Sequence, residues 1–233
     1  VIGVVIDAGI CRIVLASLDG TLVDHFEIQF RTPDTYVELI DTAADQIATL
    51  LRSDVQTLGL GVSLPGLIDS NAQRGLLSPN VPMTDGHSPS EDLSFKLGLP
   101  SVLLQECHAL CLAERQYGNA RSLDDFAMLD ASTGVGLGVL TAGRLLTGKS
   151  GLAGEIGHLP MEPNGHPCGC GRQGCLETLA SDTALARLVS ERLGQNISIE
   201  EIIPLVGSGE LSVGRELGQV TKHLAFALAT SIN

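Results

Sequence analysis

The stretch HPCGCGRQGCLE, residues 166–177, contains three of the six cysteines in a chain of 233 residues. Cys168, Cys170 and Cys175 are interspersed with glycines, and glycine allows a short loop to wrap closely around a small ion. His158, ten residues before the first of these cysteines, offers an imidazole as a fourth donor. Three thiolates and one imidazole are a recognised closed tetrahedral set for zinc, so the sequence predicts a structural rather than a catalytic metal site.

Two other interpretations of this stretch stay open: a glycine-rich loop with incidental thiols, and a redox-active pair of cysteines. Six cysteines in a chain of this length are too few for a disulfide scaffold, which favours metal ligation by the clustered thiols. Cys107 and Cys111 lie one helical turn apart, and we expect them to pack as small buried hydrophobic residues.

Composition limits the classes of protein that the chain can represent. Hydrophobic residues make up 44%, aromatic residues only 3%, and tryptophan is absent, which indicates an aliphatic core of the kind found in sheets covered by helices. The formal net charge of -13 would repel a phosphate backbone, which argues against nucleic-acid binding by this chain alone. No apolar run reaches about 20 residues, the length of a membrane span, and no signal peptide is found, so we expect a cytoplasmic protein without membrane contact.

The first half of the chain predicts an α/β unit. Residues 1–9, 11–20 and 21–30 are rich in β-formers and predict a three-stranded antiparallel meander with a turn at residues 19–20. Residues 35–51 carry apolar side chains at alternating steps of three and four, which predicts an amphipathic helix. A strand, a short helix, a strand and a helix are then expected, with the strands within residues 57–66 and 101–106 and the last helix at residues 107–117.

In the second half of the chain a similar opening series of strands is expected. Strands are expected at residues 125–132, 134–143 and 144–148, followed by a loop and two or three helices. We therefore predict two α/β lobes, residues 1–119 and residues 120–233, of which the second carries the cysteine loop. Apolar residues keep helical spacing up to the last residues without a capping signal, so the C-terminal end is expected to be truncated relative to a longer polypeptide.

Glycine-rich turns occupy matching places in the two halves. Asp7 and Gly9 end the first strand of the first half, and residues 132–138, STGVGLG, join the first two strands of the second. Such turns expose backbone N–H groups that phosphate oxygens can approach, although either turn taken alone is better explained as an ordinary hairpin, since glycine-rich turns are common in β-structure. Their matching positions favour phosphate binding. The candidate contacts are Asp7, Gly9, Thr133, Gly134 and Gly136.

Six segments, in their order along the chain, resemble the ROK family of repressors, open reading frames and sugar kinases. They are SLPGLID (63–69), SPNVP (78–82), LLQECHALCLAE (103–114), STGVGLG (132–138), GEIGHLP (154–160) and CGCGRQGCLETLAS (168–181). The resemblance extends over nearly the whole chain, and its cysteine motif is highly specific. It implies an α/β protein with the actin-like, hexokinase-like ATPase fold, in which two α/β lobes surround a cleft.

The resemblance also implies roles for particular residues. The metal ligands it implies are His158, Cys168, Cys170 and Cys175. The sugar-hydroxyl contacts it implies are Asn80, Glu155, His158 and Glu177, with Gln105 and Glu106 beside them. Carboxylates and amides pair well with vicinal hydroxyls, and a site built from them rejects molecules that lack those hydroxyls.

Two places depart from the kinases of the family. Their first loop reads Asp-x-Gly-Gly-Thr where this chain has DAGIC, residues 7–11, so that Ile10 replaces a glycine and Cys11 replaces a hydroxyl. Glu106 stands where the kinases place an aspartate as general base, and misplacement of a base by ~1 Å can cost on the order of 100-fold in rate. At Asp7, Gly9 and the second glycine turn, this chain agrees with the kinases of the family.

These departures favour a sugar-binding sensor, the effector domain of a ROK-type transcriptional regulator. We expect it to carry structural zinc, to form a homodimer or higher homo-oligomer, and to contact DNA only through a helix-turn-helix segment that is not in this sequence. The alternative is an ATP-dependent kinase of hexoses or N-acetylhexosamines, similar to glucokinases. In that alternative Glu106 is the catalytic base, and ATP with Mg²⁺ binds near Asp7 and the two turns.

Overall fold

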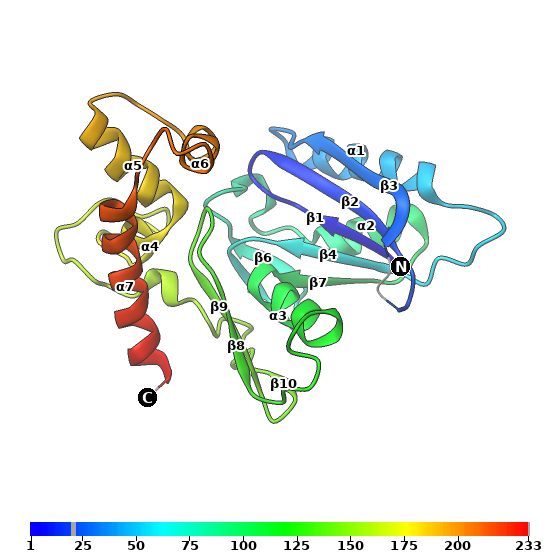
Figure 1. The fold of residues 1–233 in the computed structure, drawn as a ribbon. Coiled ribbons are helices and arrows are strands. Elements are labelled where there is room, and N and C mark those ends of the chain that lie inside the picture. The colour runs from blue at the N-terminus through cyan, green and yellow to red at the C-terminus, as the bar shows by residue number, and fades with distance from the viewer. Residues whose placement is uncertain (20–21, 233) are drawn as a thin grey trace. The chain divides into compact units, whose positions relative to one another are not determined.

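The computed structural model describes residues 1–19 and 22–232 (Figure 1). The chain forms two compact units, each made of two separate stretches: Val1–Phe126 with Val139–Ala153, and Ala127–Gly138 with Gly154–Asn233. We call these unit 1 and unit 2. The chain first passes from unit 1 to unit 2 after Phe126, shortly beyond the predicted lobe boundary after residue 119. That boundary stays a prediction.

Unit 1 is built on a five-stranded sheet in the order β3-β2-β1-β4-β7. The strands are β1 (Ile2–Val5), β2 (Ile10–Ala16), β3 (Leu22–Arg31), β4 (Leu60–Leu64) and β7 (Ser101–Gln105). Strands β1, β2 and β3 pair antiparallel, which confirms the predicted meander, although Gly20 in its expected turn lies outside the described residues. Strands β4 and β7 continue the sheet in parallel.

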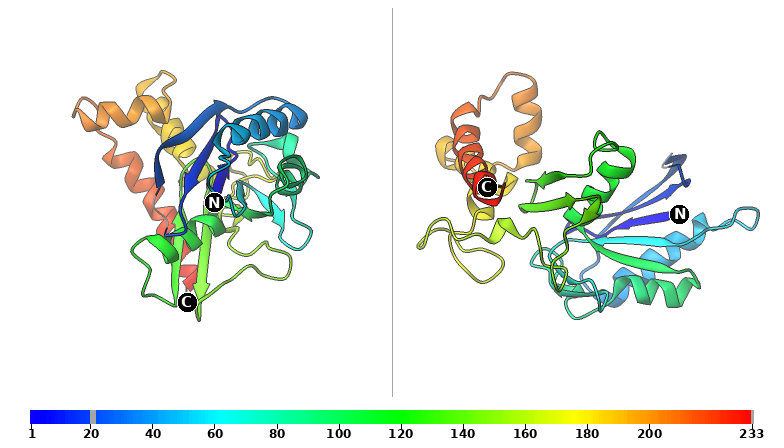
Figure 2. Two further views of the ribbon diagram at one scale, coloured as in Figure 1. Left: turned by 90° about the vertical axis from the view of Figure 1, so that its right-hand side faces the viewer. Right: turned by 90° about the horizontal axis from the view of Figure 1, so that it is seen from below.

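Three helices pack on this sheet. Helices α1 (Tyr36–Leu50) and α2 (Pro89–Leu97) cover one face, and α3 (Glu106–Tyr117) lies on the other (Figure 2). The Thr35 hydroxyl caps α1 by accepting from the Glu38 backbone N–H. Ile40, Ala44 and Ile47 are buried as predicted, whereas Val37 at the start of the same apolar pattern is 68% exposed. The core is aliphatic, and Cys107 and Cys111 are buried in it as expected.

Several short elements were not predicted. Strands β5 (Leu67–Asp69) and β6 (Arg74–Leu77) form a separate two-stranded sheet, followed by the 3₁₀ helix η1 (Pro82–Thr84). They were missed because strands of three or four residues are too short to show a clear alternation of apolar and polar residues. The three strands expected in the second half are present as β8 (Phe126–Asp130), β9 (Gly136–Thr141) and β10 (Arg144–Leu145).

Unit 2 is mainly helical after β9. It contains η2 (Ile156–His158), α4 (Glu177–Ala180), α5 (Asp182–Leu193), α6 (Ile199–Gly207) and α7 (Gly214–Ile232). Four α-helices are therefore described where two or three were expected, and α4 is a single turn. Helix α5 packs against both α6 and α7 (Figure 2), and Ser198 begins α6 with a capping box. No helix of the described residues is long and apolar enough to cross a membrane.

We expect stability to fall in mild acid because of His108. This side chain is 2% exposed, its Nε2 lies 3.2 Å from the Ala153 carbonyl oxygen, and burial lowers its pKa. The unfolded chain, in which histidine has a pKa of about 6.5, therefore binds more protons below that pH, and the free energy of unfolding decreases as pH falls. Chemical denaturation between pH 8 and pH 5 should show a shallower decrease for His108→Gln than for the wild type. Equal slopes would contradict this assignment.

Candidate metal centre and binding residues

The backbone that leads to His158 runs tightly against the second glycine turn. The Leu137 N–H donates to the Gly154 carbonyl oxygen at 2.9 Å, and Gly154 has φ +95°. A Cβ on Gly154 would lie 1.9 Å from the Leu137 carbonyl oxygen, and one on Gly157 would lie 2.1 Å from the Val135 carbonyl oxygen. Only glycine fits at these two positions, and their close approach fixes the 3₁₀ turn η2 that ends at His158.

The cysteine loop folds back on itself through short backbone contacts. Pro167 and Gln173 form an isolated antiparallel bridge, and the Cys168 N–H donates to the Arg172 carbonyl oxygen at 2.8 Å. A second bridge joins Cys175 to Pro160, two residues after His158. These contacts bring the predicted ligands together although they are spread over residues 158–175.

The four predicted ligands form one cluster. The donor atoms of His158, Cys168, Cys170 and Cys175 all lie within 4.8 Å of one another, an arrangement that could hold a metal ion. The Cys170 and Cys175 sulfurs are 3.7 Å apart, and the Cys168 Sγ is 3.6 Å from the His158 Nδ1. Tetrahedral bonds of about 2.3 Å to sulfur and about 2.0–2.1 Å to nitrogen would separate these donors by about 3.8 Å and about 3.6 Å. The donor set therefore fits a four-coordinate ion.

Protonation of the thiols opposes metal binding at low pH. Burial raises the pKa of Cys168 to about 12 and also raises the pKa of Cys175. At Cys170 burial acts in the same direction, but hydrogen bonds from Arg172 and the neighbouring thiols outweigh it and lower the pKa to about 7. A metal ion must displace these protons, so affinity for metal increases with pH.

His158 connects the cluster to a carboxylate. Its Nδ1 faces the cysteine sulfurs, and its Nε2 lies 4.0 Å from Glu155 Oε2. With Nδ1 bound to metal, the remaining proton would be on Nε2, which faces Glu155 at a distance longer than a direct hydrogen bond. Burial and the charge of Glu177 raise the pKa of Glu155 to about 7.

Glu177 is the first residue of α4 and lies between the cluster and the glycine turn. Its Oε2 accepts from the Val135 N–H at 3.2 Å, and its Oε1 is 3.8 Å from the Cys168 Sγ. Two of the predicted sugar contacts, Glu155 and Glu177, thus lie beside the predicted metal ligands in unit 2. The third, His158, is itself one of these ligands. The contact from Glu177 to the turn was not predicted, because residues 42 positions apart leave no local signal.

The other predicted sugar contacts belong to unit 1. Asn80 is exposed just before η1. The Gln105 side-chain oxygen accepts from the His108 N–H at 3.0 Å and caps α3, a structural role that was not predicted. Glu106 is half-buried at the first position of α3, where a negative charge is favoured by the helix dipole.

The first glycine turn presents an apolar side chain to solvent. Ile10 is 44% exposed beside the turn, while Cys11 is fully buried with its Sγ 3.4 Å from the Thr32 hydroxyl. The Asp7 carboxylate accepts from the Ala8 N–H at 2.6 Å, and Gly9 is exposed. Of the two replacements noted in the sequence, Ile10 is therefore the one that changes the surface of the turn.

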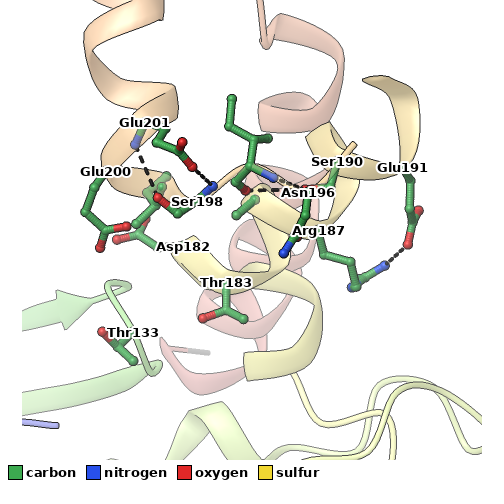
Figure 3. A pocket seen from close by; sticks show the side chains of 13 residues that line it. Thr133, Asp182, Thr183, Arg187, Ser190, Glu191, Asn196, Ser198, Glu200 and Glu201 are labelled. Atoms are coloured by element: carbon green, nitrogen blue, oxygen red, sulfur yellow. Dashed lines mark hydrogen bonds and ion pairs between the residues drawn. The ribbon is translucent and has the colours of Figure 1, made fainter. Parts of the chain in front are cut away.

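The second glycine turn borders a pocket of ≈ 540 Å³ in unit 2 (Figure 3). Thr133 lies at one side of the pocket, and α5 and α6 supply most of the rest. Four carboxylates line it, and one guanidinium, that of Arg187, is bound to Glu191 at 3.0 Å. Burial and the charges of Asp130 and Glu200 raise the pKa of Asp182. This acidic pocket was not predicted, because it forms only when α5 and α6 pack together beside Thr133.

The layered α/β architecture of the chain is that of the actin-like ATPase fold. The crystal structure of a ROK hexokinase from Thermus thermophilus superposes with a TM-score of 0.79 and 27% identity, covering 100% of this chain and 77% of that one. The ROK family model matches residues 2–233, and the chain belongs to the ROK family.

Both regulators and kinases are among its relatives. A xylose repressor from Bacillus spizizenii is 30% identical over 233 residues, 98% of this chain and 60% of the repressor. A glucokinase from Thermotoga maritima is 39% identical over 132 residues, 57% of this chain and 42% of the kinase. The chain thus spans less than two thirds of the length of these curated relatives.

Gly154→Ala should be much more damaging than Gly194→Ala. Both glycines have positive φ, which costs another residue about 1–3 kcal/mol, but a Cβ on Gly194 meets nothing within 4 Å whereas one on Gly154 meets the backbone. We expect Gly194→Ala to lose about 1 kcal/mol of unfolding free energy and Gly154→Ala to lose about 3 kcal/mol or more. Chemical denaturation of both variants measures the difference, and similar losses would refute the close approach.

Proposed function

We propose that this chain is the sugar-binding effector domain of a ROK transcriptional regulator, with zinc at its Cys/His centre. The observation that carries the proposal is the exposed Ile10 in the first glycine turn, together with Glu106 at the position of the general base. A branched side chain on this turn keeps phosphate oxygens away from the backbone N–H groups that glycine would leave open.

The acidic pocket beside Thr133 supports the same conclusion. Asp182 and Glu200 line it, and neither has an ion-pair partner among the described residues. A nucleoside triphosphate carries several negative charges, and uncompensated carboxylates at the second turn would repel it.

A sugar suits the residues around the metal. The carboxylates of Glu155 and Glu177 accept hydrogen bonds from hydroxyls, and the Nε2–H of His158 can donate one. Zinc is the metal that we assign, because a Cys3His set is closed, tetrahedral and structural. In this proposal the metal holds His158 and the two carboxylates in position for the sugar.

The wider role follows from the same assignment. We expect a cytoplasmic homodimer that contacts DNA through a helix-turn-helix segment not contained in this sequence, since a net charge of -13 repels nucleic acid. Sugar binding would then shift the conformational equilibrium of the regulator.

A second candidate is an ATP-dependent sugar kinase. Asp7, Gly9 and the second glycine turn are kept, and Glu106 is still a carboxylate that could accept a proton from a sugar hydroxyl. Magnesium would then be held near Asp7.

Incubation with ATP, magnesium and a panel of aldoses and N-acetylhexosamines separates the two candidates. For a regulator we expect sugar-dependent thermal stabilisation without release of ADP. Sugar-dependent turnover approaching the typical ~10 per second of enzymes would reject the regulator and establish the kinase. The double variant Ile10→Gly/Glu106→Asp is the matched control, since it restores the kinase residues at the exposed position of the first turn and at the base position and leaves the buried Cys11 unchanged.

The zinc assignment predicts one metal ion per chain by elemental analysis. Cys170→Ser removes a ligand, and its affinity for metal should fall by at least the roughly 100-fold that loss of a supporting contact alone can cost. Sugar affinity, measured by calorimetry, should weaken in parallel because the metal orders His158 and its neighbours. Cys111→Ala, in a buried cysteine of unit 1, is the control and should retain the metal. Unchanged sugar affinity in Cys170→Ser would refute the structural role.

A further inference from the structure

The carboxylate of Glu177 contacts two parts of unit 2, the glycine turn at residues 132–138 and the cysteine loop. We propose that Glu177 is a positioning residue through which the metal centre controls the conformation of the glycine turn at residues 132–138. The inference rests on the metal site of the proposed function, but it holds equally for a regulator and for a kinase.

On one side, the carboxylate fits closely against the backbone of the turn. Its Oε2 accepts from the Val135 N–H at 3.2 Å. A Cβ on Gly134 would lie 2.9 Å from the same oxygen, so a larger residue there would push the carboxylate away from the turn. A charge-assisted hydrogen bond of this kind is stronger than one between neutral groups.

On the other side, Glu177 is held between two metal ligands. Its Oε1 lies 3.8 Å from the Cys168 sulfur. Two residues before it, the Cys175 carbonyl oxygen accepts from the Thr178 N–H at 3.0 Å and from the Thr178 hydroxyl at 2.8 Å, so α4 begins directly on a ligand. Metal-bound Cys168 is a thiolate with no proton to donate to Oε1, so the link from the metal to Glu177 runs through the backbone: an ion that fixes Cys175 also fixes the first turn of α4, which carries Glu177.

The turn transmits this constraint to the acidic pocket. The Ser132 carbonyl oxygen accepts from the Asp182 N–H at 2.9 Å, which ties the turn to the start of α5. Thr133, the next residue, lines the pocket together with Asp182 (Figure 3). A molecule that contacts Thr133 thus meets a surface whose shape depends on the occupancy of the metal site.

Amide hydrogen exchange of residues 134–137 tests the positioning role in metal-loaded protein. In Glu177→Ala the Val135 amide should exchange roughly 10-fold faster, as expected for loss of a hydrogen bond to a charged group, while the metal content is unchanged. Glu177→Gln should retain most of the protection, because its amide oxygen can still accept from Val135. Glu162→Gln, in an exposed residue of the same region, is the charge-matched control and should leave exchange unchanged.

Removal of the metal by a chelator provides the second measurement. Removal of the metal should increase amide exchange of residues 134–137 in the wild type. It should increase exchange little further in Glu177→Ala, because that variant already lacks the hydrogen bond between Val135 and Glu177. Unchanged Val135 exchange in metal-loaded Glu177→Ala, or full protection of the turn in metal-free wild type, would overturn the inference. Wild-type protein that binds no metal would instead contradict the zinc assignment, and the Glu177→Ala comparison would still decide whether Glu177 positions the turn.

Discussion

The close approach of two backbone segments, residues 135–137 and residues 154–157, is the constraint on which the rest of unit 2 depends. Glycine at positions 154 and 157 makes this approach possible, since a Cβ on Gly154 or Gly157 would overlap a carbonyl oxygen of the opposite segment. The approach places His158 at the end of a short 3₁₀ turn and presents its Nδ1 to the cysteine loop. The loop then adds three sulfurs, and Glu177 connects them back to the first segment.

The electrostatics of this region are consistent with the proposed metal ion. Burial raises the pKa of Cys168, Cys175 and Glu155, so three acidic groups are difficult to ionise within a small volume. A divalent ion reverses this preference, because it compensates the thiolate charges and permits deprotonation. Structure and charge are therefore coupled: the backbone geometry concentrates the donors, and the metal makes their ionised forms stable.

Features with a local signature could be predicted from the sequence. The meander, the amphipathic helix α1 and the metal ligands follow from alternation, helical periodicity and the spacing of cysteines and glycines. A contact between distant residues could not, since the approach of Glu177 to Val135, 42 positions away, leaves no local signal. The cap that Gln105 provides for α3 is local, but glutamine is not among the residues preferred at this position. The acidic pocket depends on how α5 and α6 pack, although all but one of its lining residues fall within residues 182–201. The two-stranded sheet of β5 and β6 was missed because its strands are very short.

Neither unit consists of one uninterrupted stretch of chain, and this affects how the protein can be divided. A fragment that starts at Gly154 would contain the cysteine loop and all of α4 to α7, yet it would lack the strand and turn of residues 127–138. The carbonyl oxygen of Gly154 and the carboxylate of Glu177 would then lose their backbone donors. Expression of the half that carries the Cys/His cluster as an independent module would therefore require the earlier strand to be grafted back, for example by circular permutation. On the ribosome, likewise, residues 127–138 must wait for the later stretch to emerge before unit 2 can form.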